Sequence, residues 1–200
     1  MCREALAMTF VEGTVAGRRV APMRRALGFT LLELMVTVTV AGVIFAFGVP
    51  SFVDLVRNNR AATNVNELLT AFSIARSEAI RRGSNITVCR SSDGNACTAG
   101  SWASGWIVIR DNAATDTAAP VVGEVLRTWP AMPGNAAVTT FANAAAADVG
   151  WVRFTPRGGM RAAGAMPIRY DIELDGCSGQ QMRRVVLNTV GHATVTREAC

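Results

Sequence analysis

The sequence predicts an α+β protein in which one long N-terminal helix packs against an antiparallel β-sheet head. Two observations lead to this prediction. Residues 29–50 are mostly apolar and Glu33 is their only charged residue, and apolar residues then recur at spacings of three and four up to Arg82, which is the period of a helix. From Ile86 onward, short segments rich in β-branched and aromatic residues alternate with Gly, Pro, Asn and Asp clusters, as is typical of strands. The expected regions are 1–28, 29–50, 51–83 and 84–200.

Residues 29–50 form an apolar segment of membrane length. A helix of these 22 residues spans about 33 Å, which matches a bilayer core. Glu33 is the only charged residue in it, and a carboxylate at such a position is costly unless it has a partner and a function. Arg24 and Arg25 precede the segment and should stay on the cytoplasmic side. We therefore expect one transmembrane helix with the rest of the chain outside; an ordinary signal anchor, with Glu33 incidental, is the alternative.

The helix should continue beyond the membrane as an amphipathic segment, 51–83. Pro50 removes one backbone donor and is expected to bend or loosen the helix. Arg81 and Arg82 followed by Gly83 form a C-terminal signal. The stripe has only about two clean heptads, so we expect it to cover the head rather than to form a coiled coil. Its expected buried residues are Val65, Leu68, Phe72, Ala75 and Ala79.

The head, 84–200, should contain eight strands. The run Ala142–Ala147 consists of small residues and is expected to be a loop or a short turn of helix. The expected strands are Ile86–Arg90, Gly105–Asp111, Val121–Trp129, Val138–Phe141, Trp151–Thr155, Ile168–Leu174, Arg183–Asn188 and Ala193–Arg197.

Four cysteines lie in the head, and an even number outside the cytoplasm indicates two disulfides. Three pairings are possible, and local closure favours Cys89–Cys97 and Cys177–Cys200. Each should contribute about 2–4 kcal/mol. We expect no metal site and no cofactor, because the sequence has no Cys-x-x-Cys pair and His192 is its only histidine.

The stretch Gly28-Phe29-Thr30-Leu31-Leu32-Glu33 resembles the processing site of type IV prepilins. The resemblance implies that a membrane peptidase cuts after Gly28, that Phe29 is N-methylated and that Glu33 guides assembly into a filament. A proline at the depth of Pro50 is also typical of pilins. Residues 23–28 form a complete basic leader by themselves, so we expect Met23 to be the start and 1–22 to be an over-extended gene model.

The head resembles the GspH/FimT group of minor pilins and pseudopilins. This resemblance implies a pilin-like fold and a subunit of a type II secretion pseudopilus or a type IV pilus. Its expected partners are other pilins and the prepilin peptidase/methyltransferase, and it should span the inner membrane with its head in the periplasm. The matching motifs are Arg76–Arg81, Val88–Gly94, Gly105–Asp111, Phe154–Gly158 and Val185–Gly191.

A pilus-tip binding module, for DNA or a surface ligand, is the alternative function. Some FimT-like proteins bind DNA through a C-terminal Gly-Arg-x-Arg motif, but this chain reads Gly191-His192-Ala193-Thr194. Without residues 1–28 the chain has 15 arginines and 13 acidic residues, a net charge too small to indicate nucleic-acid binding. Interspersed arginines and acids are typical of a solvated strand face. The candidate contacts for weak DNA binding are Arg157, Arg161, Arg183 and Arg184.

Nothing in the sequence indicates an enzyme. It contains no Gly-x-Ser-x-Gly elbow and no phosphate-binding loop with its lysine. His192 is expected to be a turn residue without chemistry. The four tryptophans are expected to be core or strand-face residues rather than a sugar or peptide platform; they are Trp102, Trp106, Trp129 and Trp151.

Overall fold

The computed structural model describes residues 28–200. The expectations about the leader before Gly28 and about Met23 as the start lie outside these residues. The chain divides into two compact units with the boundary after Ile44, and each is described by itself. A single helix, α1 (Leu31–Arg82), contains Pro50 and continues through it.

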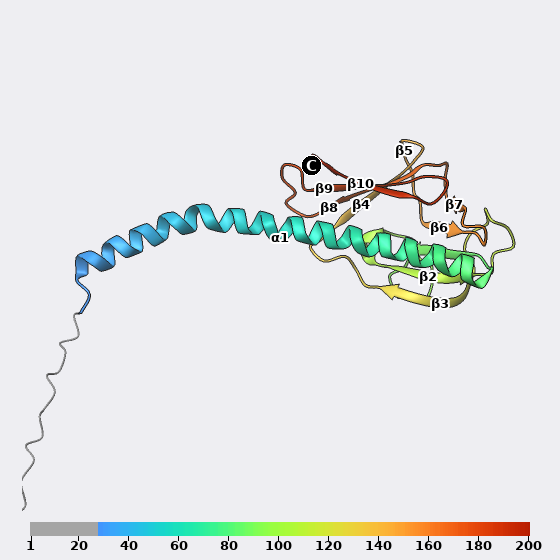
Figure 1. The fold of residues 1–200 in the computed structure, drawn as a ribbon, viewed down its shortest axis with the longest axis horizontal. Helices are drawn as coiled ribbons and strands as arrows, with labels where there is room; N and C mark the ends of the chain where they lie inside the picture. Colours follow the sequence, from blue (N-terminus) through green and yellow to red (C-terminus); the bar gives the residue numbers. More distant parts are fainter. Residues whose placement is uncertain (1–27) are drawn as a thin grey trace, which may run out of the picture. The chain divides into compact units, whose positions relative to one another are not determined.

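In the second unit, ten strands form two five-stranded sheets in which all strand pairs are antiparallel (Figure 1). The first sheet has the order β3-β2-β1-β6-β7 and the second has the order β10-β9-β8-β4-β5. A single 3-10 turn, η1 (Trp102–Ser104), precedes β2. The strands are β1 (Ile86–Arg90), β2 (Trp106–Asp111), β3 (Val122–Trp129), β4 (Ala137–Ala142), β5 (Ala145–Ala146), β6 (Trp151–Phe154), β7 (Met160–Ala162), β8 (Ile168–Glu173), β9 (Met182–Leu187) and β10 (Ala193–Glu198).

The predicted fold class, a long helix with an antiparallel head, is confirmed, and all eight expected strands are present. The expectation for Ala142–Ala147 was wrong, because β4 and β5 form a hairpin there. Its turn residues Asn143 and Ala144 have φ of 46° and 69°. Small residues have little intrinsic strand propensity, so pairing with the neighbouring strand decides their conformation. The short strand β7 was also missed.

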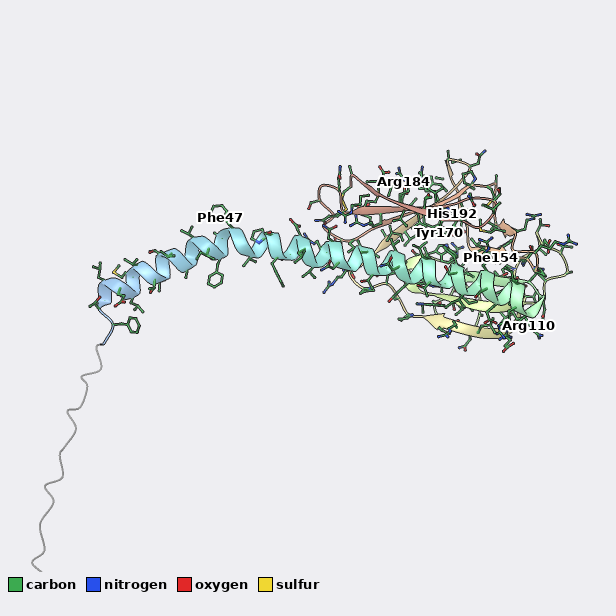
Figure 2. All side chains as sticks on the ribbon, viewed as in Figure 1. Phe47, Arg110, Phe154, Tyr170, Arg184 and His192 are labelled. Atoms are coloured by element: carbon green, nitrogen blue, oxygen red, sulfur yellow. A yellow bond between two sulfur atoms is a disulfide. The ribbon has the colours of Figure 1, made fainter. Side chains whose placement is uncertain are left out.

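One hydrophobic core joins the second half of α1 to both sheets. The expected stripe is buried, and Ala61, Asn64 and Ala71 are buried beside it. Phe72 lies at the centre, with its ring centroid 5.7 Å from that of Tyr170 and 6.4 Å from those of Trp102 and Phe154. Figure 2 shows Phe154 and Tyr170 inside the second unit, beside the helix. The helix is thus a structural part of the head and not only an attachment to it.

The other face of the first sheet is also covered. Cys89 of β1 and Ile107 and Ile109 of β2 form a second buried cluster, against which Cys97 and Trp151 pack. A disulfide joins Cys89 to Cys97 and holds the intervening loop over this face. This explains why β1 and β2 are buried on both sides instead of alternating between buried and exposed residues.

A buried ion pair fixes the loop between β2 and β3. The side chains of Arg153 and Asp111 are both fully buried, and Arg153 Nη2 lies 2.6 Å from Asp111 Oδ2. The guanidinium also donates to the carbonyls of Thr115 and Ala118 in the loop, while Thr87 Oγ1 donates to the same carboxylate oxygen at 2.5 Å. A buried charge must be paired and hydrogen-bonded, so this network holds residues 112–121 on the sheet.

Candidate processing and assembly site

Gly28 and Phe29 lie outside the helix, in exposed and irregular backbone. Phe29 is 82% exposed. A Cβ built on Gly28 would meet no described atom within 4 Å. The described neighbours therefore do not require glycine at this position.

Thr30 caps the N-terminus of α1. Its side-chain Oγ1 accepts a hydrogen bond from the backbone N–H of Glu33 at 3.2 Å, and its carbonyl accepts from the N–H of Leu34 at 3.1 Å. Thr30 and Glu33 have the spacing of a capping box, in which the glutamate is the third helical residue. Glu33 thus lies in the first turn of α1, where the helix dipole favours a negative charge. The helix begins at Leu31 rather than at Phe29, because the cap at Thr30 closes its N-terminal end.

The residues on both sides of this cap expose an apolar surface. Phe29, Leu31 and Leu32 are 72–82% exposed, and every residue from 28 to 40 is exposed. By length and composition, α1 is the one helix in the described part of the chain that could cross a membrane. Exposed apolar surface of this extent marks a membrane or protein interaction site.

The four arginines considered as DNA contacts do not form one exposed surface. Arg157 and Arg161 are exposed and line a common hollow beside the turn that follows β6. Arg183 is buried, where it donates to Asn58 Oδ1 at 2.7 Å; burial and the nearby Arg197 lower its pKa. Arg184 pairs with Asp171 and Glu198, and the hydrogen bond to Asp171 raises its pKa. Two of the four candidates are thus engaged within the protein.

The remaining expectations concern single residues. His192 is exposed in the turn between β9 and β10, and no group of three His, Cys, Asp or Glu suited to a metal ion occurs within residues 28–200. Trp102 and Trp106 are core residues. A second disulfide joins Cys177 to Cys200, so both pairings favoured by local closure are present. Sequence reasoning missed a groove beside α1 near Arg57 and Arg60, which is described below.

A membrane-length apolar helix with one carboxylate in its first turn, followed by a helical half packed on antiparallel sheets, defines a protein of the type IV pilin-like class. The family model for "Type II transport protein GspH" matches residues 64–191, and that for the "Prokaryotic N-terminal methylation motif" matches residues 23–49. The first match covers more than half of the chain, and the chain belongs to the GspH family. It is therefore a minor pilin or pseudopilin, a structural filament subunit.

Two solved structures are similar to this chain, and the first of them shows the same fold. The type IV minor pilin FimU of Pseudomonas aeruginosa is 18% identical with a TM-score of 0.51, and the match covers 69% of this chain and 89% of FimU. The minor pseudopilin EpsH from the type 2 secretion system of Vibrio cholerae is 12% identical with a TM-score of 0.44, covering 69% of this chain and 97% of EpsH. A comparison with curated proteins gives no match.

Proposed function

We propose that this minor pilin or pseudopilin is cut after Gly28, methylated on Phe29 and inserted into its filament through Glu33. In this proposal residues 1–28 are the leader, 29–50 cross the inner membrane, 51–83 continue the helix, and 84–200 form a periplasmic head. The chemistry at Gly28 is performed on this chain by a prepilin peptidase and methyltransferase, and the filament contacts are with other pilins.

The observation that carries the proposal is the isolated Gly28. A side chain there would touch nothing among the described residues. The bond between Gly28 and Phe29 lies just before Thr30, which caps the helix. A peptidase needs an accessible substrate outside regular secondary structure at the cut, and residues 28–30 are exposed and irregular. A small residue at 28 is then explained by the shape of the peptidase site.

Glu33 supplies the assembly contact in this proposal. Cleavage would turn the backbone nitrogen of Phe29 into an α-amine, four residues before Glu33. A carboxylate surrounded by lipid tails or apolar helices needs a cationic partner. In a filament, the α-amine of a neighbouring subunit can be that partner, so one ion pair would both admit a new subunit and set its axial position.

The two disulfides support a periplasmic head. Disulfides persist in oxidising compartments and are rare in the cytoplasm, and both bonds of this protein lie after residue 88. Arg24 and Arg25 precede the apolar segment, which favours a cytoplasmic N-terminus. The two arguments are independent and give the same orientation.

Intact-mass analysis of the chain purified from its host membrane tests the processing. The expected mass is that of residues 29–200 with both disulfides and one added methyl group. A mass that retains residues upstream of Phe29 contradicts the proposal.

Two substitutions of Glu33 separate its charge from its position in the helix cap. Glu33→Gln keeps a side chain that suits a capping box but removes the charge, whereas Glu33→Val removes both. If the ion pair guides assembly, both variants are cleaved normally and both are lost from sheared filaments. Normal incorporation of Glu33→Gln would refute charge pairing and assign Glu33 to the helix cap.

Deleting the gene distinguishes the two filament systems. Loss of exoprotein secretion with normal piliation assigns the subunit to a secretion pseudopilus, and the reverse result assigns it to a type IV pilus. No change in either would contradict an assembly role.

A further inference from the structure

We propose that a groove beside the second half of α1 binds the headgroup of an anionic phospholipid at the outer face of the membrane. The juxtamembrane groove, as we call it, has a volume of about 450 Å³. It lies within the second unit and opens between α1 and the loops that follow β3 and β8. Its side chains that matter here are Phe52, Val53, Val56, Arg57, Arg60 and Leu174.

The groove combines an apolar part with a cationic part. Phe52 is 65% exposed and Val53 is 39% exposed, while Leu174 at the groove floor is 5% exposed. Arg57 and Arg60 follow Phe52 by about 7.5 and 12 Å along the helix at 1.5 Å per residue. An apolar wall followed by two guanidinium groups is complementary to a lipid, whose acyl chains adjoin a phosphate. Guanidinium groups bind phosphate oxygens with paired N–H donors.

Two glycine turns hold the arginines against the groove. A Cβ at Gly176 would lie 2.7 Å from Arg57 Nη2, and a Cβ at Gly134 would lie 3.6 Å from Arg60 Cδ. Both glycines have positive φ, a conformation that favours glycine. The Arg57 guanidinium therefore occupies space that a side chain at 176 would fill, and the stem of Arg60 lies along the turn at 134.

The nearby carboxylates do not fully pair with the positive charges of the two groove arginines. Arg57 Nη1 is 3.6 Å from Asp54 Oδ1, which is longer than a direct hydrogen bond. The same oxygen of Asp54 accepts a hydrogen bond from Gln181 at 3.2 Å. Asp175 also lines the groove. Within residues 28–200, Arg60 makes no ion pair within 4.0 Å, so it can bind an anion without losing a partner.

The position of the groove in the sequence selects a lipid as the occupant. This step rests on the proposed function, in which residues 29–50 span the membrane. Arg57 and Arg60 then follow the end of the span by about 10 and 15 Å, and the headgroup layer is about 5–7 Å deep on each side. Helical side chains lean toward the N-terminus of their helix, here toward the membrane, and arginine readily extends its head to the interface. Both side chains can therefore extend from the groove toward the headgroup layer, and Arg57 is the nearer of the two.

The full-length chain, reconstituted in an equimolar mixture of phosphatidylcholine and phosphatidylglycerol, provides the test. After detergent extraction, native mass spectrometry counts the lipids retained on each chain. We expect retained phosphatidylglycerol to exceed phosphatidylcholine, and the double variant Arg57→Gln/Arg60→Gln to lower this ratio about thirtyfold, since each of the two basic residues near an anionic surface contributes about 1 kcal/mol. The preference should also weaken at high salt.

Arg81→Gln is the matched control, because Arg81 is exposed on the same helix but far from the groove. It should keep the wild-type lipid ratio. An unchanged ratio in the double variant, or an equal loss in Arg81→Gln, would overturn the proposal. Equal binding of soluble glycerol phosphate by the chain in lipid-free detergent would assign the groove to free phosphate and also overturn it.

Two further measurements keep these results interpretable. Thermal unfolding of each variant should match the wild type, because both groove arginines are partly or fully exposed. Resistance to extraction by alkaline carbonate reports membrane insertion regardless of the headgroup. A chain that inserts without lipid preference overturns only the groove proposal, whereas a chain that does not insert overturns the proposed function.

Discussion

The N-terminal segment and the head use glycine in opposite ways. A Cβ at Gly28 or Gly42 would meet no described atom within 4 Å, whereas a Cβ at Gly105 would lie 2.7 Å from the carbonyl oxygen of Trp129. Gly105 also has φ of 116°, which other residues rarely adopt. The head therefore needs its glycine for its own packing. The glycine at 28 has no such contact among the described residues.

The phenylalanines of α1 show the same contrast. Phe72 is 3% exposed within the core, whereas Phe52 on the same helix is 65% exposed, and Figure 2 shows Phe47 on a part of the helix that lies apart from both sheets. Burying a phenylalanine stabilises a protein by about 1.5–3 kcal/mol. The head obtains this energy by folding alone, and the earlier segment can obtain it only from lipid or from other subunits.

Substitutions of Gly28 and Gly105 should give the largest effects, one on cleavage and the other on the stability of the head. Gly28→Leu is expected to abolish cleavage, so that only precursor accumulates, while the melting temperature of the head stays unchanged. Gly105→Ala should do the reverse, because it destabilises the head without touching the cleavage site. Intact mass and thermal unfolding measure the two properties on the same samples.

Gly42→Leu controls for bulk in the apolar segment. Gly42 is as free of neighbours as Gly28, yet it lies inside the helix, so this variant should be cleaved normally. A loss of cleavage in Gly42→Leu equal to that in Gly28→Leu would show that bulk anywhere in the segment disturbs processing.

The next largest effect is expected from the phenylalanine pair. Phe72→Ala should lower the free energy of unfolding by about 3–5 kcal/mol through loss of burial and formation of a cavity. Phe52→Ala should change it by less than about 0.5 kcal/mol. Denaturant unfolding of the full chain in detergent, followed by tryptophan fluorescence, checks both. Similar losses in the two variants would show that Phe52 also belongs to the folded core.

The buried ion pair of Asp111 and Arg153 should make the stability of the head depend on pH in the acid range. Burial raises the pKa of Asp111, but hydrogen bonds from Thr87, from the backbone and from Arg153 outweigh it and lower the pKa below its ordinary value. The folded pKa is thus below the unfolded value of about 3.9. The contribution of Asp111 to stability is therefore present above about pH 4 and is lost as the pH falls through the folded pKa.

Asp111→Asn tests this dependence. The variant should be less stable at neutral pH by about 3–5 kcal/mol, because it leaves Arg153 buried without a counter-charge. Its stability should also fall less steeply than that of the wild type between pH 5 and 2, a range about the unfolded pKa. Urea unfolding at a series of pH values measures both. An acid limb of unchanged slope would exclude Asp111 as its source.

The smallest effect is expected at Asp148. Its hydrogen bonds with Arg90 lower its pKa, but its side chain is 73% exposed. Exposed ion pairs contribute about 0–1 kcal/mol, so Asp148→Asn should cost less than about 1 kcal/mol and should leave the acid limb nearly unchanged. A loss as large as that of Asp111→Asn would mean that burial does not determine the strength of these pairs.

Much of this fold could be predicted because its signals are local. The stripe from Val65 to Ala79 has the helical period, and β8 alternates buried residues with partly or fully exposed ones over Ile168–Glu173. The hairpin β4–β5 could not be predicted, because Ala145 and Ala146 carry no strand signal and become a strand only by pairing with Phe141 and Ala142. The strand propensity of a residue does not include the effect of pairing with a neighbouring strand.

The candidate sites show the same division. Gly28, Phe29 and Glu33 are adjacent in sequence, so their spacing alone indicated processing and assembly. Arg183 and Arg184 are neighbours on β9, yet the first is buried against Asn58 and the second is paired with Asp171. No sequence pattern distinguished them from exposed arginines, since their partners are 125 and 13 residues away.

By itself, the sequence determined the N-terminal processing motif, the membrane-length helix, the eight main strands and the favoured cysteine pairs, because each depends on residues close together along the chain. Only the tertiary structure decided which charges are buried, that both sheets share one core with a face of the helix, and that Arg57 and Arg60 line a groove with Leu174. These features depend on contacts between residues far apart in sequence, whose desolvation and pairing energies exist only after folding brings them together.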